Sequence, residues 1–199
     1  YNTKVLQRLE DNNHWELLGF KVESGESKVG DKMIISRPIE HTPNIINQEL
    51  GIYTIKVQAY SDYASECRYV AQCITNDIQD QKLRPDDICV ICLDNGNIKS
   101  YYSLLSKMLI KNGISTFNLV EAPNANKHFF YDNYVTLSTI NKAKGNEAGM
   151  VYIIGADTIF INRDNVLLRN KLFTAITRTK GWVTITGGEK IKYCLEELN

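Results

Sequence analysis

Residues 88–93 read Ile-Cys-Val-Ile-Cys-Leu, an uninterrupted apolar run that begins directly after the turn-forming segment 83–87. Such a run is typical of a strand buried on both faces of a parallel sheet. Residues 101–111 then place leucine and methionine at helical spacing, and Asn112-Gly113 ends this helix before a short apolar stretch at 114–119. The chain around the run therefore predicts the order strand, helix, strand.

The same alternation continues on both sides of this unit. Residues 51–60 alternate in the manner of a strand, and residues 61–81 show helical spacing with Ser61 or Asp62 as the expected N-cap. Towards the carboxyl terminus we expect strands at 134–140, 150–154 and 182–186 and helices at 163–179 and 189–198. Strands that alternate with amphipathic helices predict an α/β fold with a mostly parallel sheet.

The composition is that of a globular protein without a global charge. Hydrophobic residues make up 43% of the 199 residues, and 23 basic residues balance 23 acidic ones. Because the net charge is zero, contacts with nucleic acid have to be local. No apolar run approaches the roughly 20 residues that cross a bilayer, and residues 1–10 lack the apolar core of a signal peptide. We therefore expect a cytoplasmic protein with no membrane partner.

The five cysteines are odd in number and lie mostly in apolar stretches. Cys89 and Cys92 form a C-x-x-C pair, but the sequence has no second pair, and a strand would turn the two side chains to opposite faces. We expect reduced thiols in the core and no metal site.

A polar segment stands between two of the expected strands. Residues 139–147 read Thr-Ile-Asn-Lys-Ala-Lys-Gly-Asn-Glu. Gly145 permits a turn that lets the backbone approach a ligand, and lysine, hydroxyl and amide side chains suit phosphate and sugar contacts. Because charged loops between buried strands often carry function, this segment is a candidate ligand-binding loop.

Residues 169–180 read Arg-Asn-Lys-Leu-Phe-Thr-Ala-Ile-Thr-Arg-Thr-Lys, within the helix expected before the last strand. The two segments, in this order, resemble motifs V and VI of superfamily 1 UvrD-like helicases, whose usual forms are T-x-H-x-x-K-G-x-E and R-x-L-x-Y-V-A-x-T-R-A. Asn141 stands where the family pattern has histidine. The resemblance implies the second RecA-like domain of such a helicase, a three-layer α/β/α domain over residues 33–199. Residues 1–32 are then expected to be an N-terminal extension at the edge of the preceding helicase domain.

The resemblance also implies an ATP site. Arg178 would be the catalytic arginine finger that reaches the γ-phosphate, and such an arginine contributes a factor of about 10³ to 10⁵ to the rate. Gly145 and Glu147 would complete the ATP site beside Arg178, with Glu147 near the ribose.

The first of the two motifs further implies a contact with nucleic acid. Thr139, Asn141 and Lys142 would bind single-stranded DNA, which makes this strand the expected partner. In the second motif the helical spacing is expected to turn the apolar side chains toward the core, namely Leu172, Phe173 and Ile176.

The cofactor that the resemblance implies is ATP with Mg²⁺, held mainly by a first RecA-like domain. No Walker A or Walker B pattern occurs in the 199 residues, and residues 25–32 lack the order G-K-[ST] that a phosphate loop requires. We therefore expect the chain to be inactive alone. Joined to a first domain, it would act as an ATP-dependent DNA helicase or translocase, of a kind used in DNA repair.

Two other functions are compatible with parts of the sequence. A binding module that keeps the helicase fold without catalysis is favoured by the missing ATP loop, and by Glu40 at the arginine position of a weak motif IV match over 38–46. A dinucleotide enzyme of the doubly wound α/β class is poorly supported, because no G-x-G-x-x-G follows an expected strand. A G-K-[ST] loop in the preceding domain would favour the motor over the binding module.

Overall fold

The computed structural model describes residues 11–28, 30–41, 54–121, 128–161 and 165–194. The chain divides into two compact units, Tyr1–Ile52 and Tyr53–Asn199. The expected strands, helices and site residues lie in the second unit, except that residues 51–53 of the first expected strand lie outside the described part. Each unit is described by itself.

The first unit contains a short helix and a two-stranded antiparallel sheet. Asp11 caps the helix, because its side chain accepts a hydrogen bond from the His14 amide at 3.1 Å. One strand lies before the domain boundary expected after residue 32, and the strand that pairs with it lies after that boundary. The compact unit extends to Ile52. Its elements are α1 (Asn12–Leu17), β1 (Lys21–Ser24), β2 (Ile34–Ser36) and the 3₁₀ turn η1 (Ile39–His41).

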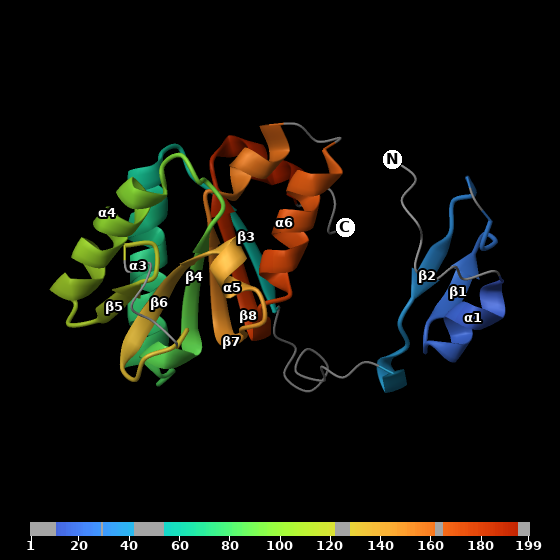
Figure 1. The fold of residues 1–199 in the computed structure, drawn as a ribbon, viewed down its shortest axis with the longest axis horizontal. Helices are drawn as coiled ribbons and strands as arrows, with labels where there is room; N and C mark the ends of the chain where they lie inside the picture. The colour runs from blue at the N-terminus through green and yellow to red at the C-terminus, as the bar shows by residue number, and fades with distance from the viewer. Residues whose placement is uncertain (1–10, 29, 42–53, 122–127, 162–164, 195–199) are drawn as a thin grey trace. The chain divides into compact units, whose positions relative to one another are not determined.

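A six-stranded sheet forms the centre of the second unit, and every pair of neighbouring strands in it is parallel. The strand order is β3-β8-β7-β4-β6-β5 (Figure 1). The apolar run predicted as a doubly buried strand is β4, whose five residues are all buried. The strands are β3 (Ile55–Ala59), β4 (Ile88–Cys92), β5 (Ser115–Asn118), β6 (Tyr134–Thr139), β7 (Ala148–Ile154) and β8 (Thr179–Gly187).

Helices cover both faces of this sheet, with α3 and α4 on one side and α6 on the other (Figure 1). Asp62 caps α3, as one of the two expected caps, because its side chain accepts from the Ser65 amide at 2.9 Å. The helices are α3 (Tyr63–Gln79), α4 (Ile98–Lys111), α5 (Ile140–Ala143) and α6 (Val166–Ile176), with 3₁₀ turns η2 (Pro85–Asp87), η3 (Ala156–Ile161) and η4 (Glu189–Ile191). The expected three-layer α/β fold is confirmed.

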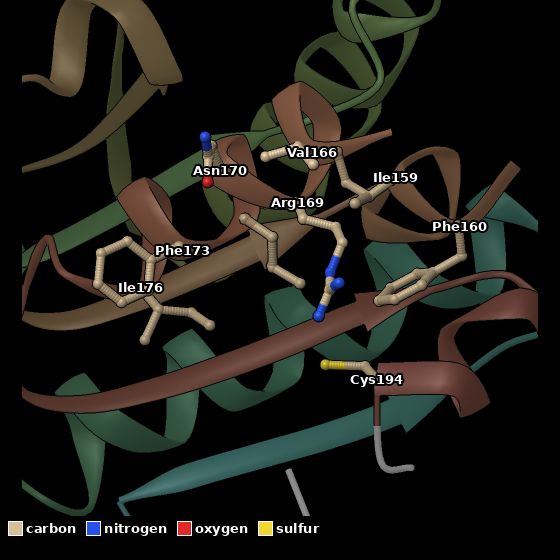
Figure 2. Close-up of a pocket in the computed structure, with 9 residues that line it drawn as sticks. Ile159, Phe160, Val166, Arg169, Asn170, Phe173, Ile176 and Cys194 are labelled. Atoms are coloured by element: carbon tan, nitrogen blue, oxygen red, sulfur yellow. The ribbon is translucent and has the colours of Figure 1, made fainter. Parts of the chain in front are cut away.

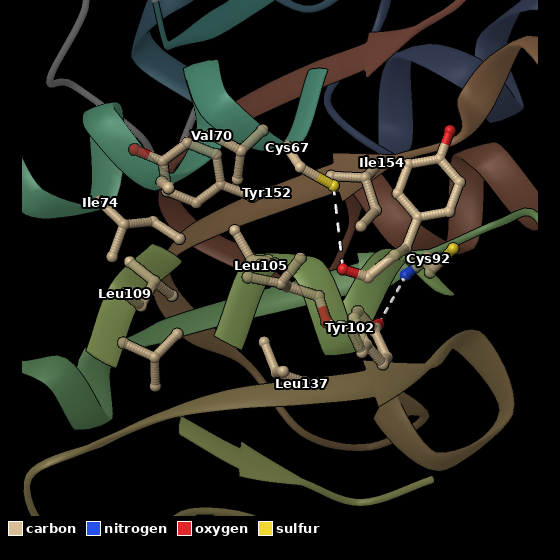
Figure 3. Packing of buried hydrophobic residues seen from close by; sticks show 14 of the residues in the cluster. Cys67, Val70, Ile74, Cys92, Tyr102, Leu105, Leu109, Leu137, Tyr152 and Ile154 are labelled. Carbon is tan, nitrogen blue, oxygen red and sulfur yellow. Dashed lines mark hydrogen bonds between the residues drawn. The ribbon is translucent and has the colours of Figure 1, made fainter. Parts of the chain in front are cut away.

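The two faces of the sheet have separate apolar clusters, and β4 contributes to both. Cys92 belongs to the cluster under α3 and α4, where Tyr102 and Leu105 also pack (Figure 3). Cys89 belongs to the cluster under α6. The prediction that the two thiols face opposite sides is confirmed, and the five cysteines are thiols that form no disulfide.

Several element ends differ from the sequence prediction. α6 ends at Ile176 and β8 begins at Thr179, so the predicted helix 163–179 is too long at its carboxyl end, and residues 162–164 lie outside the described part. The closing helix expected at 189–198 begins as the turn η4, and residues 195–199 also lie outside the described part. Among the described residues no helix is long and apolar enough to cross a membrane.

Candidate functional site

Thr139 is the last residue of β6 and lies at the carboxyl edge of the sheet, where it pairs with Cys92 at the end of β4. Its hydroxyl oxygen accepts a hydrogen bond from the Lys142 amide at 3.3 Å and so caps α5. The predicted DNA-binding threonine therefore also begins the short helix that follows it.

The two other residues predicted to contact DNA follow on α5. Asn141 is exposed, and its amide group is accessible at the carboxyl edge. The Lys142 ammonium donates a hydrogen bond to the Leu119 carbonyl, which follows the end of β5. Lys142 thus ties α5 to the chain beyond the neighbouring strand, and both residues are exposed.

Gly145 and Glu147 lie on the approach to β7, at the opposite edge. Ala148 begins β7 and pairs with Thr179 at the beginning of β8, so Glu147 stands at the amino edge of the sheet. Gly145 has a φ of +82°, and a Cβ placed on it would meet no heavy atom within 4 Å. The glycine therefore serves the backbone turn, and the space beside it is open.

Arg178 also lies at the amino edge, in the turn between α6 and β8. Its carbonyl accepts a hydrogen bond from the Ala148 amide at 2.9 Å, which places Arg178 beside Glu147. The guanidinium turns back onto its own helix, where Nε donates to the Thr174 carbonyl and Nη2 donates to the Thr177 hydroxyl, both at 3.1 Å. The fold thus brings together the two charged residues predicted for the ATP site.

Residues 134–186 match the family model of the UvrD-like helicase C-terminal domain. The resemblance to a UvrD-like helicase is confirmed. The matched stretch runs from the first residue of β6 into β8 and contains every residue predicted for the site.

A solved structure shows a similar fold, the C-terminal domain of a possible DNA helicase from Lactobacillus plantarum WCFS1. It is 14% identical to this chain with a TM-score of 0.51, and the match covers 70% of this chain and 79% of that one. At this identity the likeness supports the fold alone. No curated protein matches the chain.

The outer surface of α6 in the UvrD-like segment is largely uncovered, and it exposes apolar side chains beside the polar Arg169 and Asn170. Phe173, predicted to pack in the core, is 68% exposed, so that prediction is wrong, whereas its neighbour Leu172 is buried. The helix begins at Val166 rather than at 163, and its first residues Val166 and Leu167 are exposed as well.

A pocket of about 360 Å³ adjoins this uncovered surface. Figure 2 shows the Arg169 side chain reaching between Phe160 and Cys194, with Phe173 and Ile176 further along the same helix. The pocket therefore lies on the helix that ends just before Arg178, and not at Arg178 itself.

The buried carboxylate of Glu66, at the carboxyl edge of the sheet, was not predicted from the sequence. Glu66, in the first turn of α3, is 1% exposed and accepts three hydrogen bonds. They come from the Gly155 amide at 2.8 Å, the Thr186 hydroxyl at 2.7 Å and the Tyr101 hydroxyl at 2.8 Å. Burial raises the pKa of Glu66, which these hydrogen bonds only partly offset.

Glu66, on α3, bonds to Gly155 just after β7, to Thr186 near the end of β8 and to Tyr101 on α4. Gly155 and Thr186 both lie within the UvrD-like segment. The apolar residues of this helix recur at Ala64, Cys67, Val70, Ala71 and Ile74, and Glu66 is one residue before Cys67. Its role depends on three partners far away in the sequence, so no local signal reveals it. Among the described residues no group of three or more His, Cys, Asp or Glu side chains could hold a metal ion.

Proposed function

We propose that this chain is the second motor domain of an ATP-dependent DNA helicase or translocase. In this proposal it completes an ATP site held mainly by a first RecA-like domain, and it contacts single-stranded DNA. The UvrD-like match over residues 134–186 and the helicase-like fold support the assignment of this domain to a UvrD-like helicase. The roles of the individual residues rest on their places in the fold.

The observation that carries the proposal is the placement of the two predicted sites at opposite edges of one sheet. Thr139 ends β6 at the carboxyl edge, whereas Glu147 and Arg178 stand at the amino edge. Residues 140–147, which begin with α5, are the direct connection between these edges. A displacement of this segment by a nucleotide at one edge would therefore be transmitted to a DNA strand at the other, which is what a motor requires.

The residues at the amino edge suit a nucleotide. A guanidinium is planar and can bind phosphate oxygens with two parallel hydrogen bonds, and a carboxylate can accept from ribose hydroxyls. ATP with Mg²⁺ supplies the phosphoanhydride bond that is hydrolysed. Arg178 would exchange its bonds to Thr174 and Thr177 for phosphate oxygens, and there its positive charge would offset the negative charge that develops during hydrolysis.

The residues at the carboxyl edge suit a DNA strand. Hydroxyl and amide groups commonly contact phosphate and sugar, and Asn141 is exposed where such a strand would pass. Lys142 would add a positive charge near the strand while its ammonium stays bonded to the Leu119 carbonyl. The DNA strand would then lie against α5, the helix that leads to Glu147.

The uncovered surface of α6 suits the proposed partner domain. The helix that leads to Arg178 exposes Val166, Leu167 and Phe173. Asn170, also exposed, lies between Val166 and Phe173 on this side of α6, and exposed apolar side chains with polar neighbours are common at interaction surfaces. A first RecA-like domain that covered this surface would also come close to Arg178, as closure around ATP requires.

The test is ATP hydrolysis by a protein that joins this chain to an ATP-binding first domain, measured with and without single-stranded DNA. Arg178→Ala is compared with wild type, and Arg68→Ala, an exposed position on α3, is the matched control. We expect DNA-stimulated hydrolysis in wild type and control, and a loss of about 10³-fold or more in Arg178→Ala.

Either of two results would overturn the motor assignment. Full DNA-stimulated turnover in Arg178→Ala would show that Arg178 does not act in the active site. Absence of turnover in wild type, with DNA binding retained, would support the alternative of a non-catalytic binding module that keeps the helicase fold.

A further inference from the structure

Tyr63 is an exposed aromatic residue at the carboxyl edge of the sheet. It is the first residue of α3, directly after the N-cap Asp62, and follows the end of β3. Its side chain is 49% exposed. An aromatic ring that remains half exposed at the end of a sheet is available to a ligand.

The Tyr63 ring has a fixed support. It packs at an angle of 67° against the ring of Tyr101, with 5.7 Å between the centroids. Tyr101 is itself buried, and its hydroxyl donates to the Glu66 carboxylate at 2.8 Å. Because the supporting ring is held by a buried hydrogen bond, Tyr63 loses little side-chain freedom when a ligand covers it.

The same edge carries the residues proposed to contact DNA. Tyr101 is followed by Tyr102, whose buried hydroxyl donates to the Ser138 carbonyl at 2.5 Å. Ser138 precedes Thr139, the last residue of β6. The first five residues of α4 therefore connect Tyr63 with the end of β6, across the edge formed by the ends of β8, β7 and β4.

We propose that Tyr63 stacks on an unpaired base of the DNA strand that Thr139 and Asn141 contact. This inference rests on the proposed function and adds a base-binding position to it. Stacking on an aromatic ring accepts any base, because every base has a π face. Asp62, the residue before Tyr63, carries an exposed carboxylate that disfavours a phosphate in this region, which favours contact of the ring with a base.

A second tyrosine provides a matched control. Tyr134 is 41% exposed and also packs edge-on against an aromatic ring, that of Phe117, with 6.5 Å between the centroids. It begins β6 and therefore lies at the amino edge. The two tyrosines share exposure and support but differ in the edge on which they lie.

The experiment measures binding of the 199-residue chain to fluorescent oligo-dT and to an abasic oligonucleotide of equal length. The variants are Tyr63→Ala, Tyr63→Phe, Tyr63→Trp and the control Tyr134→Ala. Loss of one stacking contact is expected to weaken oligo-dT binding by Tyr63→Ala roughly 5- to 100-fold. Phenylalanine and tryptophan at position 63, and Tyr134→Ala, should bind like wild type or more tightly.

Two further readouts separate stacking from a phosphate contact or from unfolding. Tyr63→Ala should bind the abasic strand as wild type does, and the slope of log Kd against log salt concentration should be unchanged, since no phosphate contact is removed. The circular dichroism spectrum should also be retained. A weaker affinity of Tyr63→Ala for both strands would mean structural damage and would overturn the stacking role.

The outcomes distinguish this proposal from the function on which it rests. Binding of oligo-dT by wild type with an unchanged Kd in Tyr63→Ala would overturn the stacking role alone. Failure of wild type to bind either strand would overturn both the stacking role and the DNA contact.

Discussion

The Nε atom of Arg178 donates a hydrogen bond to the Thr174 carbonyl, one turn back on α6, at 3.1 Å. The arginine therefore has a resting position on its own helix, and it must leave that position to reach a phosphate. A lysine has no planar fork and cannot form two parallel bonds with one phosphate. The local bonds of Arg178, one half-buried and one exposed, have neutral acceptors and contribute little to stability.

Arg178→Lys is accordingly expected to abolish DNA-stimulated hydrolysis nearly as fully as Arg178→Ala does. Thermal unfolding of the variant should match wild type. Both are measured in a protein that joins this chain to an ATP-binding domain. A lysine variant with more than about a tenth of wild-type turnover would mean that charge alone suffices and that the fork is not used.

Thr139 has two roles that one substitution can separate. Aspartate caps helices as well as threonine does, but its negative charge repels a phosphate backbone. Thr139→Asp should therefore keep the stability of the chain while weakening binding to single-stranded DNA, as measured by urea unfolding and by fluorescence anisotropy. Thr139→Ser, which keeps a neutral hydroxyl, is the control. Unchanged DNA affinity in Thr139→Asp would leave Thr139 as a helix cap only.

Glu66 makes the stability of the chain depend on pH. Because burial raises its pKa above the ordinary value of 4.5, the folded chain binds more protons than the unfolded chain in the window above that value. The stabilising contribution of Glu66 is complete below the pKa that its carboxyl has in the unfolded chain. It is lost as the pH rises through the pKa of the same carboxyl in the folded chain. Stability should fall across this window in wild type and fall less in Glu66→Gln, as measured by urea unfolding at a series of pH values.

Glu66→Ala is the contrasting variant. It leaves the Gly155 amide and the Tyr101 hydroxyl without the Glu66 acceptor, while the Thr186 hydroxyl keeps only its 3.3 Å contact with the Ile153 carbonyl, so it should lose about 3 kcal/mol or more at every pH. A pH profile of Glu66→Gln identical to that of wild type would show that another group causes the dependence.

Two glycines with positive φ differ in what surrounds them. Gly145 has open space where a Cβ would stand, so Gly145→Ala should cost about 1 to 2 kcal/mol from backbone strain alone. At Gly155 a Cβ would lie 2.9 Å from the Asp94 Cβ and 3.2 Å from its amide nitrogen. Gly155→Ala should therefore cost clearly more in denaturant unfolding, and equal losses at the two positions would show that the close contact relaxes without penalty.

Sequence patterns predicted the parts of the fold that depend on local periodicity. The doubly buried β4 and the opposite faces of Cys89 and Cys92 follow from the apolar run and from the strand repeat of two. The end of α6 was missed, because the Arg178 carbonyl leaves the helix and accepts from the Ala148 amide, at the point where β8 begins to pair with β7. The pairing partners lie about 30 residues away, beyond the reach of helical spacing.

The site was predicted less completely than the fold. Two motifs named Thr139, Glu147 and Arg178, but only the strand register shows that Thr139 lies at one edge and the other two at the opposite edge. Glu66 and Tyr63 carry no motif, and each has its partner on α4, more than 30 residues further along the chain. Contacts at this separation are decided by packing of α3 on α4.

Phe173 and Leu172 provide a last test, because they are neighbours on α6 with opposite surroundings. Leu172 is buried under the helix, so Leu172→Ala should lower the free energy of unfolding by about 2 to 5 kcal/mol. Phe173 is exposed in the present chain, so Phe173→Ser should leave that free energy unchanged within about 0.5 kcal/mol. If α6 receives the first RecA-like domain, Phe173→Ser should reduce ATP hydrolysis in the joined protein although the isolated chain unfolds as wild type does. Full hydrolysis by the joined Phe173→Ser protein would show that the first RecA-like domain does not contact this surface of α6.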